Sequence, residues 1–152
     1  MMARSNPMLP TSPLIARAHA FGTRTALIDD DGRMRYDELL SASARAASCL
    51  LDGQADLRGA RIAFLVPPSI AYVVTQWAIW RAGGIAVPLC VSHPPPELAH
   101  VVDDAGVACV VVHESLHAQI AAVAEQRGLR VVLTSQLDAE PVQLPKLDPE
   151  RG

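Results

Sequence analysis

Apolar and polar residues alternate along the chain in blocks, and the length of each block separates predicted strands from predicted helices. Short continuous apolar runs occur at residues 61–66, 85–89, 107–112 and 130–134. Such runs are typical of strands that are covered on both faces of a sheet. Between them lie segments of about 10 to 15 residues whose apolar positions recur at helical spacing. Strands that alternate with helices predict βαβ units, and therefore an α/β fold with a layered parallel sheet and flanking helices.

The first third of the chain follows a different pattern. Ser12 followed by Pro13 predicts the start of a helical arm with Ser12 as its N-cap. Two β-like runs, 25–29 and 33–36, flank a turn that contains Asp-Gly, which predicts a hairpin. The three consecutive aspartates at this turn lack the alternating ligands and distal Glu of a calcium loop, so a turn is the preferred interpretation. Asp37 is the predicted N-cap of the next helix.

The segment 70–81 has apolar residues on nearly all sides, so we expect a buried helix, capped by Ser69 and with Trp77 in the core. From Gln136 onward the sequence becomes polar and is interrupted by prolines. The chain therefore divides into an N-terminal helical arm (1–24), an α/β subdomain (25–135) and a linker or tail (136–152).

Composition excludes several classes of protein. The chain of 152 residues is 50% hydrophobic and carries a formal net charge of -3, which fits one soluble domain and excludes a strongly basic nucleic-acid binder. No apolar run approaches the roughly 20 residues that a membrane span needs. The three cysteines form no CxxC pair, so we expect buried free thiols in a reducing compartment, the cytoplasm.

The N-terminal segment leaves one alternative open for location. It carries Arg4, Arg17 and Arg24 and has no acidic residue before Asp29, a composition that resembles a transit peptide. A solvated leading helix is the preferred interpretation of the same residues.

Motifs that carry catalytic or metal chemistry are absent from the sequence. There is no Walker A loop, no GxGxxG after a strand, no GxSxG and no HExxH. His113 and His117 are spaced for one helix face and for a shared metal, but no third ligand is evident, and a surface helix N-terminus is preferred. We therefore predict no catalytic residue and no metal ligand in this chain.

The loop after residues 85–89 is the candidate binding segment, because ligands of open α/β sheets lie at the carboxyl ends of the strands. It contains Ser92 and His93, and the Pro-rich turn and helix N-terminus that follow are expected to offer amide donors and a favourable dipole to an anion. The alternative is a loop histidine beside a proline-stiffened turn. We expect Cys90 to be a packing residue.

Four segments, in order, resemble the adenylate-forming acyl-CoA synthetases. Residues 26–39 are similar to the family stretch PALID…GR…YTYxEL, and residues 59–67 to GDRVAxLxPN. Residues 77–89 look like LAxxxAGxVxVPL, and residues 97–112 are similar to ELxYxLxDSGAKVLI. The Gly-Gly-Ile-Ala-Val-Pro-Leu stretch with its following His-Pro most resembles the malonyl-CoA synthetase branch. The resemblance covers residues 24 to 135.

The resemblance implies the first subdomain of the large domain of an AMP-forming acyl-CoA synthetase, which joins a small carboxylic acid to CoA with ATP and magnesium. The family's phosphate loop and C-terminal catalytic lysine are missing, since Thr134-Ser135-Gln136 has no glycines, and the loop is expected beyond the present C-terminus. We therefore expect no cofactor to be bound by this chain alone. Ser92 and His93 align with a region that approaches CoA in relatives, which makes them possible residues of the CoA channel.

Three functions remain open at this point. The first is an N-terminal fragment of a synthetase that is inactive alone. The second is a non-catalytic module that docks on a partner chain supplying the missing half. The third is a free-standing nucleotide- or CoA-binding domain.

Overall fold

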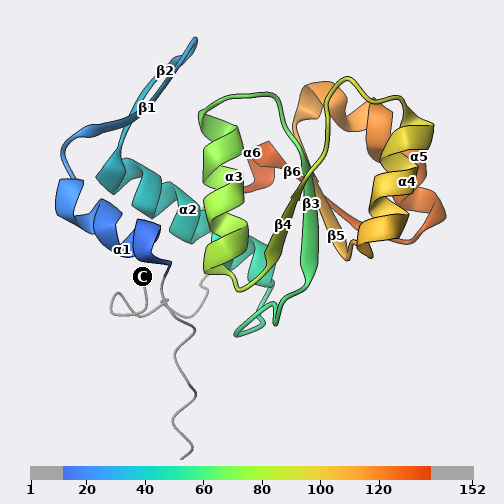
Figure 1. Cartoon of the computed structure of the whole chain (residues 1–152), viewed down its shortest axis with the longest axis horizontal. Helices are drawn as coiled ribbons and strands as arrows, with labels where there is room; N and C mark the ends of the chain where they lie inside the picture. Colours follow the sequence, from blue (N-terminus) through green and yellow to red (C-terminus); the bar gives the residue numbers. More distant parts are fainter. Residues whose placement is uncertain (1–11, 138–152) are drawn as a thin grey trace, which may run out of the picture.

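The computed structural model describes residues 12–137 (Figure 1). Its helices are α1 (Pro13–Ala18), η1 (His19–Phe21), α2 (Tyr36–Leu51), α3 (Ile70–Arg81), α4 (Pro95–Ala105), η2 (Glu114–Leu116), α5 (His117–Gln126) and α6 (Thr134–Leu137). Its strands are β1 (Thr25–Asp29), β2 (Gly32–Arg35), β3 (Arg61–Leu65), β4 (Ile85–Pro88), β5 (Cys109–Val112) and β6 (Arg130–Leu133). The predicted alternation of strands and helices, and the hairpin that precedes it, are confirmed.

The main sheet has four parallel strands in the order β4-β3-β5-β6. β1 and β2 form a separate antiparallel pair that projects from the body of the molecule (Figure 1). The chain leaves β3 for β4 on one side and then crosses back to β5 on the other side of β3. The point where the strand order reverses therefore lies between β3 and β5, and all four carboxyl ends meet at one edge of the sheet.

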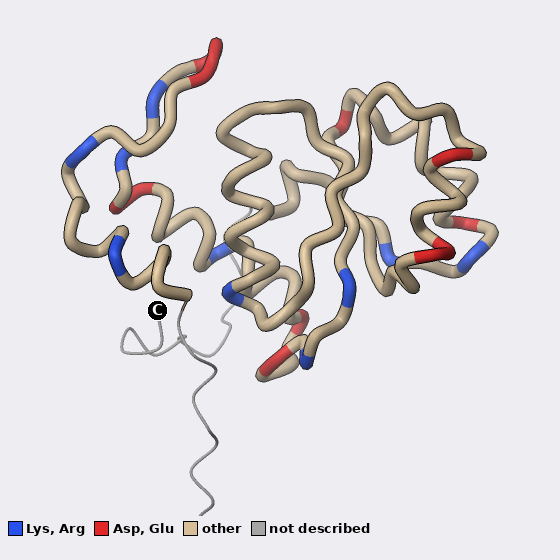
Figure 2. Tube along the Cα trace, viewed as in Figure 1, with Lys and Arg blue, Asp and Glu red and all other residues tan. Residues whose placement is uncertain are grey.

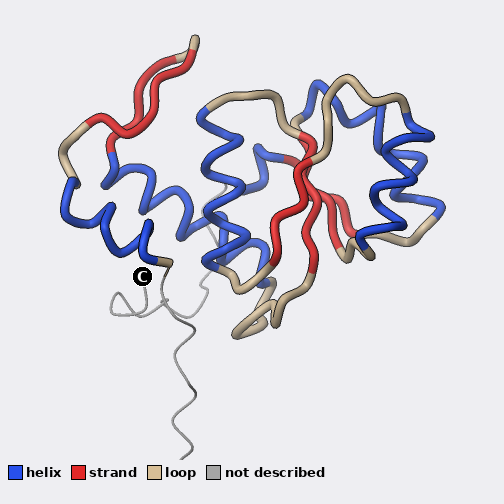
Figure 3. The backbone as a smooth tube through the Cα atoms, viewed as in Figure 1, coloured by secondary structure: helices blue, strands red, loops and turns tan. Residues whose placement is uncertain are grey.

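Helices cover both faces of the main sheet and make three layers (Figure 3). On one face, Phe64 and Val111 share a core with α2, α3 and α6. On the other, Leu65 and Val110 share a second core with α4 and α5. Because neighbouring strand residues point to opposite faces and both faces are covered, every position of β5 is buried. This explains the continuous apolar runs, and it confirms the predicted fold class.

Helix α3 is buried on most of its surface, as predicted. Ser69 is its N-cap and accepts a hydrogen bond from the backbone N–H of Tyr72 at 3.2 Å. Trp77 is only 5% exposed and lies in the core beside α2 and the sheet, but Trp80 is 39% exposed. The helix therefore has one uncovered side, which its uniform hydrophobicity did not predict.

The prediction that Asp37 is the N-cap of α2 is wrong. Strand β2 runs directly into the helix, so that Arg35 occupies the cap position in an extended conformation. The Glu38 carboxylate accepts the Arg35 backbone N–H at 2.8 Å, whereas Asp37 bonds the backbone N–H of Glu38 and the Arg35 side chain. Ser12 stands at the N-cap of α1 but its side chain makes no cap hydrogen bond.

Two further expectations need correction. Of the three thiols expected to be buried, only Cys109 is; Cys49 is half-buried and Cys90 is exposed. Helix α6 extends to Leu137, into the segment assigned to the linker or tail, and the remainder of that segment lies outside the described residues. Within residues 12–137, no helix is long and apolar enough to cross a membrane.

Candidate functional site

Polar side chains gather at the carboxyl edge of the parallel sheet, where each strand ends. The segment after β3 contributes Ser69, and the loop after β4 contributes Ser92 and His93. The segments after β5 and β6 contribute His113 and Thr134. Since β3 lies between β4 and β5 in the sheet, the two histidines follow strands that are not neighbours. The structure thus places both at this edge, in separate clusters.

The loop after β4 forms a small polar cluster of its own. The backbone N–H of His93 donates to the carbonyl oxygen of Cys90 at 3.1 Å, which closes a turn. The Ser92 hydroxyl lies 3.1 Å from the Cys90 thiol, and its hydrogen bond lowers the pKa of that exposed thiol. Cys90 is therefore not the packing residue that the sequence predicted.

His93 is held at one end and unpaired at the other. Its Nε2 lies 3.5 Å from a carboxylate oxygen of Glu97, one helical turn further along. Its Nδ1 is shielded from solvent and has no hydrogen-bond partner among the described residues. The side chain as a whole is 40% exposed. The ring is thus partly fixed and keeps one ring nitrogen without a partner.

The expectation that the start of α4 offers amide donors to an anion is wrong. Pro95 and Pro96 begin the helix and have no N–H to donate. The next two amides, of Glu97 and Leu98, both donate to the carbonyl oxygen of Pro94, at 3.0 and 3.2 Å. Glu97 also places a negative charge in the first turn. This helix N-terminus therefore does not form an anion cradle.

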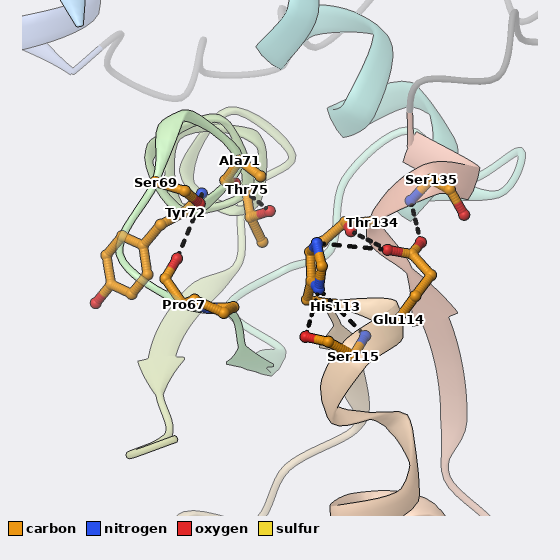
Figure 4. A network of polar contacts seen from close by, with 10 residues as sticks. All are labelled: Pro67, Ser69, Ala71, Tyr72, Thr75, His113, Glu114, Ser115, Thr134 and Ser135. Carbon is orange, nitrogen blue, oxygen red and sulfur yellow. Dashed lines mark hydrogen bonds and ion pairs between the residues drawn. The ribbon is translucent and has the colours of Figure 1, made fainter. Parts of the chain in front are cut away.

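A second cluster lies after β5 and β6 and is centred on Glu114, which the sequence did not single out (Figure 4). One Glu114 carboxylate oxygen accepts the backbone N–H of Ser135 at 2.8 Å, and the other accepts the Thr134 hydroxyl at 3.2 Å. Hydrogen bonding lowers the pKa of Glu114 to about 2; the Ser135 side chain contributes most, followed by the backbone N–H groups of Glu114 and Ser135, and the Thr134 hydroxyl contributes least. The carboxylate joins the end of β5 to the start of α6, across 21 positions of sequence.

His113 completes this cluster. Its Nδ1 accepts the backbone N–H of Ser115 at 3.2 Å and also lies 2.8 Å from the Ser115 hydroxyl (Figure 4). An Nδ1 that accepts a hydrogen bond leaves the proton of the neutral ring on Nε2, 3.7 Å from Glu114. His113 thus caps the short helix η2, as expected for a surface helix start. Among residues 12–137, no three His, Cys, Asp or Glu side chains are placed to hold a metal ion.

The two clusters order loops, but neither assembles a nucleophile with a base and a third orienting group. The geometry therefore describes a scaffold whose carboxyl edge carries polar loops.

A family profile described as AMP-binding enzyme matches residues 14–151. The chain belongs to this family. Among curated relatives, the mitochondrial malonate–CoA ligase ACSF3 of Xenopus laevis is 39% identical over 127 residues, covering 81% of this chain and 22% of that protein. The human ACSF3 is 36% identical over 152 residues, covering 93% of this chain and 26% of that protein. The resemblance to acyl-CoA synthetases, and to the malonate type, is confirmed.

Solved AMP-binding enzymes share the fold. O-succinylbenzoate coenzyme A synthetase (MenE) of Bacillus subtilis, in complex with AMP, superposes with a TM-score of 0.75 at 24% identity, covering 86% of this chain and 33% of that one. MatB of Rhodopseudomonas palustris in its apo form gives 0.72 at 26% identity, covering 89% and 29%. The chain thus spans about a quarter of the length of its curated relatives, 22% and 26% for the two above.

Proposed function

We propose that this chain supplies the first sheet-based part of a malonate–CoA ligase and does not adenylate a carboxylate by itself. The complete reaction joins a carboxylate, ATP and CoA into acyl-CoA, AMP and pyrophosphate. The observation that carries the proposal is the 39% identity to a malonate–CoA ligase over 81% of this chain. The described residues supply strands, helices and ordered loops, and no three of their His, Cys, Asp or Glu side chains are placed to hold a metal ion, which supports a scaffolding role.

ATP, magnesium and CoA are the groups that the family implies. Among the described residues no three side chains are placed to hold magnesium, and the first amides of α4 are already bonded to Pro94, so that this helix offers none to the ATP phosphates. The loop after β4 fits CoA better. Ser92 is exposed and offers a hydroxyl, and the His93 side chain is 40% exposed, so that both can line the path of a pantetheine arm. Ser92 and His93 are therefore proposed as wall residues of a CoA channel.

Pyrophosphate exchange tests the main proposal. The purified chain is incubated with ATP, magnesium, labelled pyrophosphate and malonate, and the formation of labelled ATP is measured. We expect no exchange above the protein-free blank, because stabilising charge on the transferring phosphate needs positioned amides, cations or metal ions. Exchange by the isolated chain would show that it is a complete adenylating enzyme. Co-purification of this chain with a protein other than a ligase would instead favour the non-catalytic docking module.

Calorimetric titration with CoA tests the channel residues. The titration uses this chain combined with the part of a malonate–CoA ligase that follows it. His93→Ala removes a partly exposed imidazole ring, and we expect it to weaken CoA binding by a few-fold, with the free energy of unfolding nearly unchanged. His19→Ala, in η1 far along the chain from this loop, is the matched control and should bind CoA as the unmodified protein does. Equal CoA affinity for both variants would remove His93 from the channel.

We propose the cytoplasm as the location, on the free cysteines and the sequence composition. The animal relatives carry the word mitochondrial in their names, which supports the alternative that the Arg-rich N-terminal segment is a targeting sequence. Fusion of residues 1–24 to a fluorescent protein distinguishes the two: diffuse fluorescence supports the proposal, and organellar fluorescence contradicts it.

A further inference from the structure

An open cleft lies between the projecting hairpin and the start of α3, and the segment after β3 that carries Ser69 forms part of its wall. One side is formed by the end of β1 and its turn, and the other by Pro68 and the first turn of α3. Its volume is about 420 Å³. The cleft belongs to neither polar cluster at the sheet edge.

Asp29 holds the two sides of this cleft together. One carboxylate oxygen accepts the backbone N–H of Ile70, the first residue of α3, at 2.9 Å, across 41 positions of sequence. The other accepts the backbone N–H groups of Asp31 and Gly32, at 2.9 and 3.0 Å. The contact with Ile70, first among these, lowers the pKa of Asp29. Its oxygens are thus used within the fold, and Asp29 is a structural link.

The remaining surface of the cleft has two chemical characters. Ile28 is 68% exposed, the largest exposed fraction among the large apolar side chains of the described residues, and Val73 on α3 is half-buried opposite the hairpin. Asp30 and Asp31 form an acidic rim at the hairpin tip (Figure 2). Within residues 12–137, neither carboxylate has a basic group within 4.0 Å. An apolar wall beside unpaired carboxylates favours an apolar side chain next to a cationic one.

The hairpin itself also has an uncovered edge and an exposed apolar side chain. A two-stranded sheet is marginally stable in water, and its outer edges leave backbone N–H and C=O groups unpaired. Here Leu27 and Met34 of the hairpin pack against the core, while the neighbouring Ile28 is uncovered. Ile28 and the edge of β1 are therefore both open to an extended segment that would lie in the cleft.

We propose that this cleft binds an extended polypeptide segment with an apolar side chain next to Lys or Arg, supplied by the remainder of the ligase of which this chain forms part. The inference rests on the proposed function. An open cleft without a buried polar group directed into it suits a chain segment better than a small molecule. The ligase is the source because this chain spans only 22% and 26% of its relatives, so about three quarters of such a protein lies outside it.

Co-expression tests the proposal. The tagged chain is produced together with the part of the Xenopus laevis malonate–CoA ligase that follows the matched stretch, and the affinity of the purified pair is measured. Asp30→Lys with Asp31→Lys reverses the acidic rim, and Ile28→Thr removes the apolar contact but keeps a β-branched residue in the strand. We expect each to weaken the complex about tenfold or more, the charge effect diminishing at high salt.

Matched controls are Asp104→Lys, an exposed charge reversal on α4, and Leu14→Gln, an exposed apolar residue that is 50% exposed on α1. Both should bind within about twofold of the unmodified chain, a difference of about 0.4 kcal/mol. Amide hydrogen exchange gives a second readout: residues 27–31 should become protected in the complex. If they stay unprotected, or the cleft variants bind like the controls, the inference is wrong.

The two proposals fail separately. If the complex of this chain with the remaining part of the ligase exchanges pyrophosphate, and the cleft variants bind normally, the proposed function is supported and the cleft is not the contact. If formation of that complex depends on the cleft but the complex has no ligase activity, the cleft proposal is supported and the proposed function is contradicted. Absence of any complex with the unmodified chain would overturn the cleft proposal.

Discussion

Trp77 and Trp80 lie on the same helix, and their substitution measures how much the burial of α3 stabilises the fold. Trp77 is 5% exposed and packs in the core shared by α2, α3 and the sheet. Trp80 is 39% exposed, one helical turn further along. We expect Trp77→Ala to lower the free energy of unfolding by about 3–5 kcal/mol, because the substitution removes a buried ring and leaves a cavity. This is a large part of the 5–15 kcal/mol typical of a domain.

Trp80→Ala is the matched control and should cost less than about 1 kcal/mol, because much of its ring is already in water. Both substitutions replace the same residue by alanine within one helix, so the gain in helix propensity, about 0.5 kcal/mol, is the same and cancels in the comparison. Unfolding in urea is followed by far-UV circular dichroism, which reports mainly on the backbone of the helices and strands. A near-neutral Trp77→Ala would place Trp77 on an interface and refute the assignment of this helix face to the core, and a loss for Trp80→Ala as large as that for Trp77→Ala would contradict the uncovered side of the helix.

Three further substitutions test individual contacts by the same urea measurement. Glu114→Gln should lower stability by about 1 kcal/mol at neutral pH, after allowance for a carboxylate that is 42% exposed. Since folding depresses the pKa of Glu114 from 4.5 to about 2, the difference should be full above pH 4.5 and disappear as the pH falls to about 2; a difference that persists at pH 2 contradicts this account. Ser69→Ala should cost about 1 kcal/mol by removing the cap of α3, whereas Ser41→Ala, exposed and without a cap contact, should be neutral; equal effects would exclude a capping role. Gly84→Ala should cost about 1–3 kcal/mol, because the new Cβ lies 3.2 Å from the Ala60 carbonyl oxygen and 3.1 Å from the Ile79 side chain, while Gly22→Ala meets nothing closer than 3.9 Å; a neutral Gly84→Ala would show that this turn relaxes freely.

Some features of the candidate site follow from the spacing of residues along the chain, and others do not. Ser92 and His93 lie at the carboxyl edge of the sheet, as their position after a strand predicts. The anion cradle expected beside them is absent because two prolines remove the donors and Pro94 takes the next two amides. Glu114 was missed, although a carboxylate two positions after a fully apolar strand was a signal that could have drawn attention to it.

The sequence by itself determined the elements, because their signals are local. Continuous apolar runs specify strands covered on both faces, and Gly106 ends α4 at a φ of 63°, a conformation that favours glycine. Tertiary structure alone decided which face of α3 packs against the core. It also decided from which backbone N–H group each carboxylate accepts a hydrogen bond. Asp29 and Glu114 each bond backbone groups more than 20 positions away, at Ile70 and Ser135. Those pairings depend on the strand order β4-β3-β5-β6 and on the packing of the hairpin, and no spacing along the chain encodes either.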